Sequence, residues 1–350
     1  MKIGINARTF SVSEPGGAVQ ASKRLTTELV SNTDHEVVLF GAPSLASDFD
    51  AEVHSTGFYD RQLWGVLWER LILPRLIRKS DVDVLYCPNG NAPSTEIDTP
   101  VVMCIHDVNA QKGWSGGVHG VYRKLTVPAG AEKADAVVTV SEFSKREIVE
   151  TLDIPKQKVK VIYNGINEVF FQEDSEPFDL PDRYLLFVGS LNPRKNIEGV
   201  ISAYREIRSE LDVELVFIGP ENKNIFQSLD MESVEGIHRC GYLDILEVKY
   251  AYENAEALVF PSFYEGFGLP PLESLACGTP VVASDRGSLP EVLGDAAVFV
   301  NPESTSDIAR GIRDVVLGAE ITEEQMRQQA MNYTWGSVSQ RVMMVFDSVL

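Results

Sequence analysis

Short apolar runs that alternate with helix-like stretches along the whole chain limit its fold more than any other feature of the sequence. Each run is almost continuously apolar, as expected of strands that are buried on both faces of a sheet. Strands that alternate with helices of about 10–15 residues indicate βαβ units, and therefore parallel sheets. The runs lie at residues 2–7, 36–41, 82–87, 101–107, 136–141 and 158–165 in the first half, and at 184–190, 214–219, 257–262, 280–284 and 296–301 in the second. The sequence therefore predicts an α/β protein with doubly wound parallel sheets.

The alternation is interrupted once, by the acidic, proline-containing segment FQEDSEPFDLPDR at residues 171–183. Such a segment is typical of a linker between domains. With 350 residues the chain is long enough for two cores, so we expect one domain over 1–168, a linker over 169–182 and a second domain over 183–335. Two doubly wound domains that face each other would form a ligand-binding cleft between the carboxyl ends of their strands.

The composition narrows the functional classes. The formal net charge of −20, from 51 acidic and 31 basic residues, would repel nucleic acid and argues against binding of a phosphate backbone. Salt adaptation and an ordinary acidic cytosolic enzyme both account for this acidity. The sequence shows neither a leader peptide nor an apolar run of the roughly 20 residues that span a bilayer. Its four cysteines lack the spacing of a metal site or redox pair. We therefore expect a cytoplasmic protein with reduced thiols.

The segment EGFGLPPLE holds two carboxylates, Glu265 and Glu273, at its two ends. Its glycines and the double proline at 270–271 exclude a helix over the whole spacer, but proline suits the first turn of a helix. We therefore expect Glu265 in the loop after a strand and Glu273 in the first turn of the next helix. Gly266 and Gly268 would leave backbone amides bare beside the positive end of that helix, which suits a polyhydroxylated anion. The alternative is that Glu273 only stabilises the start of the helix.

Two cations, Arg194 and Lys195, stand at the turn that follows the predicted strand 184–190. Cations at the carboxyl end of a strand, facing the start of a helix, suit a diphosphate. The alternative is a solvated pair of surface cations.

The first half of the chain offers two further candidates. Gly16 and Gly17 precede a helical pattern, where the backbone can approach a phosphate or simply form a turn. His106 and Asp107 end a buried strand at its carboxyl edge, which favours a functional histidine as much as a structural one.

Together these segments resemble family 4 of the retaining, nucleotide-sugar-dependent glycosyltransferases, which have the GT-B fold of two Rossmann-like domains facing across a cleft. The resemblance covers nearly the whole chain and is closest to mannosyltransferase-like members. The segments that carry it are EGFGLPPLESLACGTPVVAS, GSLNPRKN, VSEFSKREI, YNGI and the HD that follows a strand.

The resemblance implies a donor such as GDP-mannose or another NDP-sugar, bound mainly by the second domain. Lys195, together with Arg194, would neutralise the diphosphate. Glu273 would bind the ribose hydroxyls, and Glu265 would hold the hydroxyls of the donor sugar beside the reacting carbon. The backbone amides of Phe267, Gly268 and Leu269 would complete this site.

The resemblance also places parts of the first domain at the reaction. His106 would line the cleft near the sugar, and the loop with Gly16 and Gly17 would close over phosphate. A C-terminal helix, residues 336–350, would return to the first domain. The acceptor would be a glycan or a lipid-linked glycan.

Two positions bear on phosphate and metal binding. Many members of the family have arginine where this chain has Ser190, so Arg194 is expected to take over its contact with phosphate. Asp81 and Asp83 have the D-x-D spacing of a metal site, but they precede a strand at its amino end, and we expect them to be structural. The family usually needs no metal, so we expect neither a metal nor a cofactor.

Residues 61–80, RQLWGVLWERLILPRLIRKS, combine Trp64, Leu67, Trp68 and Leu71 at helical spacing with a basic cluster. One hypothesis is a peripheral contact with an anionic membrane at its inner face. The alternative is a core-facing helix with solvated arginines.

Three other functions compete with glycosyl transfer. A two-domain epimerase of the same fold is one of them, and the spacing of Glu265 and Glu273 disfavours it. A catalytically inactive, nucleotide-sugar-binding regulatory or scaffold subunit would keep the same motifs. A dinucleotide-dependent oxidoreductase would need a G-x-G-x-x-G after the first strand, and the segment SEPGGAVQ does not match it.

Overall fold

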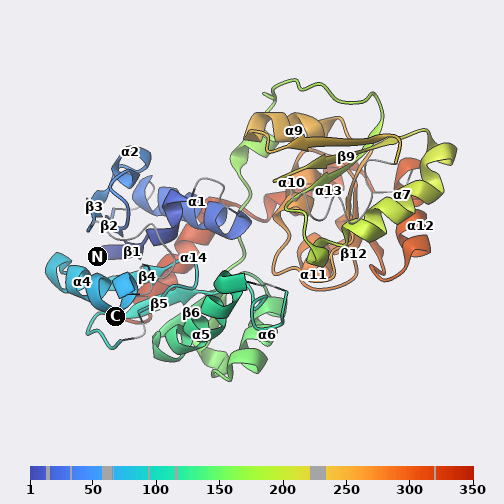
Figure 1. Ribbon diagram of the computed structural model, residues 1–350. Helices are drawn as coiled ribbons and strands as arrows, with labels where there is room; N and C mark the ends of the chain where they lie inside the picture. Colours follow the sequence, from blue (N-terminus) through green and yellow to red (C-terminus); the bar gives the residue numbers. More distant parts are fainter. Residues whose placement is uncertain are drawn as a thin grey trace. The chain divides into compact units, whose positions relative to one another are not determined.

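The computed structural model describes most of the chain in two compact units. Unit 1 consists of Met1–Gly165 and Trp335–Leu350, and unit 2 consists of Ile166–Thr334 (Figure 1). The described residues are 1–12, 16–31, 34–56, 65, 67–93, 95–114, 117–220, 234–318 and 321–350.

Unit 1 is built on a seven-stranded parallel sheet with the order β3-β2-β1-β4-β5-β6-β7. Its strands are β1 (Lys2–Asn6), β2 (Glu36–Phe40), β3 (Glu52–His54), β4 (Val84–Cys87), β5 (Val101–Cys104), β6 (Ala136–Thr139) and β7 (Val159–Val161). Its helices are η1 (Arg8–Ser11), α1 (Gly17–Ser31), α2 (Leu45–Asp48), η2 (Trp68–Ile72), α4 (Leu73–Ser80), α5 (Gly117–Lys133), α6 (Glu142–Leu152), η3 (Lys156–Lys158) and α14 (Trp335–Asp347). Because β2 and β4 lie on opposite sides of β1, the strand order reverses between β1 and β4.

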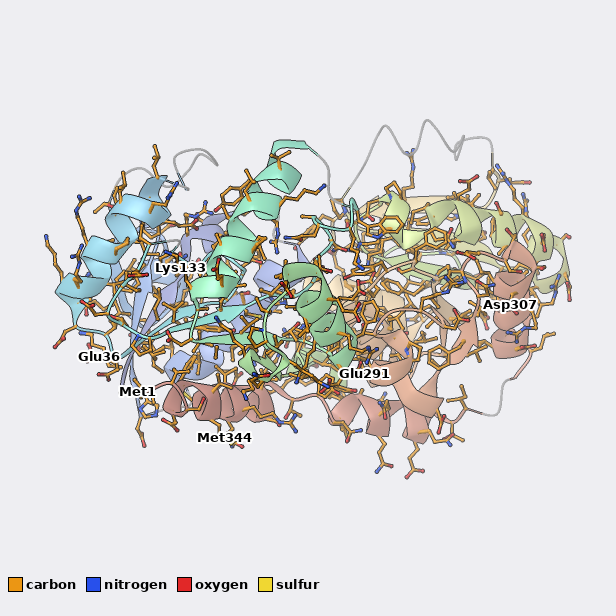
Figure 2. The ribbon with its side chains drawn as sticks, turned by 90° about the horizontal axis from the view of Figure 1, so that it is seen from below. Met1, Glu36, Lys133, Glu291, Asp307 and Met344 are labelled. Carbon is orange, nitrogen blue, oxygen red and sulfur yellow. The ribbon has the colours of Figure 1, made fainter. Side chains whose placement is uncertain are left out.

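Helix α14 completes the core of unit 1 although it lies at the far end of the sequence. It packs beside α1, and the ring of Phe346 lies 5.4 Å from that of Tyr86 in β4. A Cβ atom on Gly165 would come within 2.7 Å of the Trp335 ring, so only glycine fits beneath the start of this helix. The opposite face of α14 carries Met344, which is 62% exposed and points away from the unit (Figure 2).

Unit 2 is built on a six-stranded parallel sheet with the order β10-β9-β8-β11-β12-β13. Its strands are β8 (Tyr184–Val188), β9 (Glu214–Ile218), β10 (Ile237–Gly241), β11 (Ala257–Phe260), β12 (Val281–Ser284) and β13 (Val298–Val300). Its helices are η4 (Glu168–Phe171), η5 (Pro193–Lys195), α7 (Ile197–Leu211), α9 (Ile245–Glu253), α10 (Leu269–Ala276), α11 (Leu289–Leu293), η7 (Gly294–Ala296), α12 (Thr305–Val316) and α13 (Glu323–Met331). Here the strand order reverses between β8 and β11.

The two sheets confirm the predicted α/β class, and every apolar run identified in the sequence forms a strand. The sequence analysis did not predict two short strands, β3 and β10. Both lie at the edge of a sheet and are partly exposed, so they lack the continuous apolar character that marks a strand buried on both faces.

The predicted linker over 169–182 was wrong at its beginning. Residues 166 onward belong to unit 2, and Phe170 is 3% exposed. Its ring lies 5.9 Å from that of Tyr252 in a T-shaped contact, and its carbonyl lies 3.8 Å from the sulfur of Cys277. Sequence composition cannot reveal that a single aromatic residue anchors an otherwise polar segment.

Across the described ranges, no helix combines the length and the apolar character that crossing a bilayer requires.

Candidate active site

The point at which the strand order of unit 2 reverses positions the site. In doubly wound sheets, ligands bind outside the carboxyl ends of the strands at this point. The loop after β8 contains residues 189–196, and the loop after β11 contains residues 261–268. Both segments that the sequence singled out in the second half therefore leave adjacent strands at the same edge of the sheet.

Backbone and amide hydrogen bonds hold these two loops together. The backbone amide of Phe263 donates to the carbonyl of Arg194 at 2.9 Å. The buried side chain of Asn196 donates to the carbonyls of Pro261 at 3.2 Å and Pro302 at 2.7 Å. Asn196 itself has a φ of 56°, a left-handed conformation that asparagine tolerates better than most residues. The turn that carries the cations is thus fixed against the loop that carries Glu265.

Half-buried Arg194 and buried Lys195 and Glu265 form one cluster, called here the ion triad. Lys195 Nζ lies 2.5 Å from Glu265 Oε1, and Arg194 Nη1 lies 3.0 Å from the same oxygen. Arg194 Nη1 also donates to the carbonyl of Tyr264 at 2.7 Å. The ammonium group of Lys195 lies 4.3 Å from the centre of the Phe260 ring. Lys195 is 6% exposed and Glu265 7%, so charge interactions act here with little screening by water.

The two cations decide the ionisation of Glu265. Burial alone would raise the pKa of its carboxyl group, but Arg194 and then Lys195 outweigh burial and hold the pKa below its ordinary value. Glu265 is therefore a carboxylate at neutral pH.

The start of α10 shapes the backbone next to Glu265. Gly268 has a φ of +98°, and a Cβ atom there would come within 2.5 Å of Leu289 Cδ2, so both conformation and space require glycine. The hydroxyl of Ser288 donates to the carbonyls of Glu265 at 3.1 Å and Phe267 at 3.0 Å. These bonds fix the direction of the peptide groups that lead into the helix.

The double proline has a chemical consequence at this helix end. The first amides of a helix have no carbonyl of their own helix as partner, but Pro270 and Pro271 have no amide hydrogen. Leu269 is the first residue of α10. Because the two prolines supply no amide hydrogen, the backbone donors left at the positive end of α10 are the amides around Gly268 and Leu269.

Glu273 does not lie where the sequence analysis placed it. Helix α10 begins at Leu269 and has no acidic residue in its first turn, so Glu273 is in the second turn. The N-terminal dipole acts mainly within the first turn and gives Glu273 little stabilisation. Burial raises its pKa to about 7, and the hydrogen bond from the Tyr252 hydroxyl, at 3.1 Å, opposes that rise only in part.

His106 lies in unit 1, after β5. Its Nε2 is 3.0 Å from the carbonyl oxygen of Pro88, and because a carbonyl only accepts, Nε2 carries the hydrogen. Burial lowers the pKa of His106 more than the neighbouring Asp107 raises it. The ring is thus neutral at neutral pH, with Nδ1 as an acceptor. The Ser144 hydroxyl fixes its backbone by donating to the His106 carbonyl at 3.1 Å.

Gly16 and Gly17 also lie in unit 1, where α1 begins at Gly17. The carbonyl of Gly16 accepts a hydrogen bond from the amide of Val19 at 2.9 Å. A Cβ atom on either glycine would meet nothing within 4 Å in the described part of the chain. Among the described residues, packing therefore does not require glycine at these positions.

The positions considered for phosphate and metal binding have distinct surroundings. Ser190 is exposed, and its hydroxyl accepts a hydrogen bond from the Asn192 side chain at 3.0 Å; Arg194 supplies the guanidinium beside Glu265 instead. Asp83 accepts a bond from the backbone amide of Lys2 at 2.6 Å, and Asp81 ends α4 with a φ of 49°. Within the described ranges, no group of three or more His, Cys, Asp or Glu side chains is arranged to hold a metal ion.

Sequence reasoning missed three residues that build this site. Tyr252 donates to Glu273, Ser288 orients the peptides beside Glu265, and Asn196 joins the two loops. Only Asn196 had a visible signal, because it directly follows the two cations and precedes a helix, where asparagine is a favoured N-cap. The other two residues reach the site from separate elements.

Sequence comparisons divide the chain at nearly the same place as the fold. Residues 15–170 match the family Glycosyltransferase Family 4, and residues 169–333 match the family Glycosyl transferases group 1. O-antigen chain mannosyltransferase B of Escherichia coli is 30% identical over 231 residues, which are 61% of this chain and 61% of that protein. O-antigen chain mannosyltransferase RfbU of Salmonella typhimurium is 29% identical over 72% of this chain and 70% of its own length.

Another relative is much longer than this chain. The serotype-specific mannosyltransferase WbdA of Escherichia coli is 31% identical, but the match spans only 28% of its length. The matched region thus covers about three fifths of the first relative and less than a third of WbdA.

Solved structures share the fold over the whole chain. HepE of Anabaena, solved in complex with UDP-glucose, has a TM-score of 0.78 at 16% identity and covers 99% of this chain and 100% of its own. Sucrose-phosphate synthase of Thermosynechococcus elongatus has a TM-score of 0.78 at 17% identity, with 99% and 98% covered. At these identities the likeness establishes the two-domain GT-B architecture.

Proposed function

The chain belongs to the glycosyltransferases, with a family 4 region over residues 15–170 and a group 1 region over 169–333, and on this basis we propose that it transfers a hexose from a nucleoside-diphosphate sugar to a glycan or lipid-linked glycan. The sugar is mannose or a close analogue, because the relatives named above are mannosyltransferases. Transfer retains the configuration at the anomeric carbon and needs no metal ion. The observation that carries this proposal is the ion triad at the reversal point of the sheet in unit 2.

The ion triad suits the exchange of one anion for another. Arg194 and Lys195 converge on a single oxygen of Glu265, and the oxygens of a diphosphate are stronger and more numerous partners for a guanidinium and an ammonium. When the diphosphate binds, the carboxylate of Glu265 is released to accept hydrogen bonds from the hydroxyls of the donor sugar. The amides around Gly268 and Leu269 add donors, and Glu273 accepts from the ribose.

In the proposed reaction, Lys195 and Arg194 lie at the diphosphate that leaves the donor sugar. The bond between the anomeric carbon and the diphosphate oxygen breaks, and the diphosphate leaves with the electron pair. The acceptor hydroxyl oxygen forms its bond to the same carbon from the same face, and its proton passes to a phosphate oxygen. Lys195 and Arg194 stabilise the negative charge that grows on the leaving group. His106, neutral and held by Pro88, offers Nδ1 as an acceptor for a sugar hydroxyl.

The test combines nucleotide binding with transfer. Thermal unfolding is followed with GDP, UDP, ADP and their hexose conjugates, with and without EDTA, for wild type, Lys195→Ala and the control Arg205→Ala, which removes an exposed cation on α7. We expect one nucleotide to raise the midpoint of wild type and control, unaffected by EDTA, and much less that of Lys195→Ala. The matching sugar nucleotide is then incubated with a glycan acceptor, and the product linkage is determined by NMR.

The outcomes separate the alternatives. No midpoint shift with any nucleotide at saturating concentration contradicts the donor site. Binding without transfer to any acceptor favours the regulatory-subunit hypothesis. A shift that EDTA abolishes contradicts metal independence.

We propose a growing surface polysaccharide as the acceptor, since two relatives are O-antigen chain mannosyltransferases. A peripheral contact with the inner face of the membrane through residues 61–80 would bring the enzyme to a lipid-linked acceptor. Arg61 and Trp64 of this segment lie outside the described residues. Trp68 is 1% exposed and faces the core, whereas Leu71 is 53% exposed, so the described part has one buried and one exposed face.

A further inference from the structure

Unit 1 contains a groove that the proposed reaction does not use. It lies between α4, with the preceding η2, and the segment 95–98 that leads to β5, and its volume is about 380 Å³. The residues that line it are Arg70, Leu71, Pro74, Arg75, Arg78, Thr95, Glu96, Ile97 and Asp98. Three exposed arginines therefore share one wall, on successive turns of helix.

None of these three arginines has a carboxylate partner in the described part of the chain. Arg75 Nη1 donates to the Leu71 carbonyl at 2.7 Å, and Arg78 Nε donates to the Pro74 carbonyl at 3.3 Å. Arg70 forms no hydrogen bond or ion pair with the described residues. Arg310 on α12, in contrast, lies within 2.7 Å of Asp307 and 2.5 Å of Asp314. In a chain with 51 acidic residues, a wall of three guanidinium groups without carboxylate partners is unusual and leaves most of their donors for a ligand.

The net charge of −20 does not prevent an anion from binding here. At physiological ionic strength, charges separated by more than about 8 Å of solvent are largely screened. The arginines of the groove therefore determine the local attraction, and a guanidinium is suited to bidentate bonds with phosphate oxygens.

The opposite wall of the groove carries carboxylates, which do not suit a ligand that is only an anion. Glu96 and Asp98 line it and are exposed, so a ligand with only negative charge would be repelled from that side. Carboxylates are good acceptors for hydroxyl groups. The hydroxyl of Thr95 is buried and has no hydrogen-bond partner among the described residues, which an incoming hydroxyl would supply. A fitting ligand thus has a phosphate at one end and hydroxyls at the other.

We propose that this groove binds a phosphate ester of a polyol, with Arg70, Arg75 and Arg78 on the phosphate and Glu96 and Asp98 on the hydroxyls. This chemistry occurs both in soluble sugar or glycerol phosphates and in the headgroups of hydroxylated phospholipids. Leu71 lines the groove and is 53% exposed, and Leu67 is 46% exposed, so an apolar edge adjoins the phosphate wall. The proposal is independent of glycosyl transfer.

Two probes with the same headgroup chemistry test the proposal and distinguish the sources. Binding of glycerol 3-phosphate is measured by calorimetry, and binding to vesicles of phosphatidylcholine with and without phosphatidylglycerol is measured by sedimentation. The test variant is Arg75→Gln with Arg78→Gln. The control is Lys133→Gln with Lys156→Gln, two exposed cations of the same unit, whose loss changes the net charge equally (Figure 2 labels Lys133). Circular dichroism and the thermal midpoint verify that all three proteins fold alike.

We expect the arginine variant to bind at least one probe about tenfold more weakly than wild type, a modest effect for two charged hydrogen-bond donors, and the control to bind like wild type. The cations of the ion triad in unit 2 are the same in all three proteins. A difference in affinity between the arginine variant and the lysine control therefore measures binding at the groove. A loss with both probes identifies soluble phosphate esters as sufficient ligands. A loss confined to vesicles that contain phosphatidylglycerol assigns the groove to a lipid headgroup. Equal binding by the two variants, or no binding of either probe to wild type, overturns the proposal.

Discussion

The loop after β11 and the helix that follows it each carry a glutamate, and the pKa values of the two carboxyl groups are shifted in opposite directions. Glu265 in the loop is buried and Glu273 in α10 is half-buried, and both belong to one short segment. Arg194 and Lys195 hold the pKa of Glu265 below its ordinary value, whereas burial raises the pKa of Glu273 to about 7 and the hydrogen bond from Tyr252 opposes that rise only in part. Burial sets the direction of a pKa shift only where no opposite charge lies close, and here two cations from another loop make the difference.

Removal of Glu265 should have the largest effect. Glu265→Gln leaves two cations in a buried site without their shared carboxylate, and breaking a buried ion pair from one side costs about 3–5 kcal/mol of the free energy of unfolding. Glu273→Gln should cost little at neutral pH or raise stability, because the neutral amide removes the penalty that burial places on the carboxylate. Urea unfolding of both variants at neutral pH tests this contrast. Inorganic pyrophosphate should restore stability mainly to Glu265→Gln, and equal losses in the two variants would contradict the role of the ion triad.

The dependence of stability on pH should differ between the two carboxyl groups. The folded pKa of Glu273 is about 7 against an ordinary value of 4.5, so the folded state binds the proton more tightly. The free energy of unfolding should fall as pH rises from about 4.5 to about 7, by at most about 3 kcal/mol. For Glu265 the sign is reversed. Its contribution to stability is present above pH 4.5 and is lost as pH falls through its lowered pKa.

Urea unfolding from pH 3 to 8 measures both windows. Glu273→Gln should remove the decline between pH 4.5 and 7 and leave the acid limb unchanged. Glu265→Gln should lower the free energy of unfolding across the neutral range and change its dependence on pH only on the acid limb. A decline that persists in Glu273→Gln must come from another group.

Nucleotide binding should separate the two regions by the part of the ligand that each contacts. Lys195→Ala should weaken a nucleoside diphosphate by about 30- to 100-fold, as expected for one charged hydrogen bond in a buried site, and reduce its preference over the monophosphate. Glu273→Gln should instead reduce the preference for ribose over a 2′,3′-dideoxyribose. Calorimetry with the nucleoside diphosphate, the monophosphate and the 2′,3′-dideoxy diphosphate of the same base distinguishes the effects. If both variants lose affinity for all three ligands alike, Lys195 and Glu273 do not divide the donor as proposed.

The smallest effect is expected at Tyr252, which positions Glu273. Tyr252→Phe removes the hydrogen bond of 3.1 Å that lowers the pKa of Glu273. A lost bond of about 1 kcal/mol corresponds to a further rise of about half a unit to one unit. A ¹³C NMR titration of the carboxyl carbon, assigned by its absence in Glu273→Gln, gives the pKa directly. An unchanged pKa would show that the hydroxyl does not control Glu273.

Much of the fold follows from local patterns in the sequence. Strands buried on both faces read as apolar runs, and every one of them formed. The edge strands β3 and β10 did not read that way, because each has partly exposed residues. Phe170 shows a second limit, since its burial against Tyr252 depends on an element that follows it far along the chain.

The candidate site was only partly predictable for the same reason. The sequence predicted a turn at Arg194 and Lys195 and a helix start at Gly268 and the two prolines. The structure has a short 3₁₀ helix at the first place and the start of α10 at the second. Glu273 was placed one turn too early, because two prolines fit the first turn but do not show which residue begins the helix. Ser288 gave no signal at all, since its hydrogen bonds reach backward to the carbonyls of a loop on another strand.

The sequence by itself determined that this chain forms parallel sheets and that its charged turns follow strands β8 and β11, because periodicity and turn chemistry act between neighbours along the chain. Only the tertiary structure decided that both turns meet at one edge, that Lys195 and Arg194 share an oxygen of Glu265, and that Glu273 is left with Tyr252. The physical reason is that ionisation depends on distance through space and on the exclusion of water. Neither the distances between side chains nor the exclusion of water can be derived from the order of the residues alone.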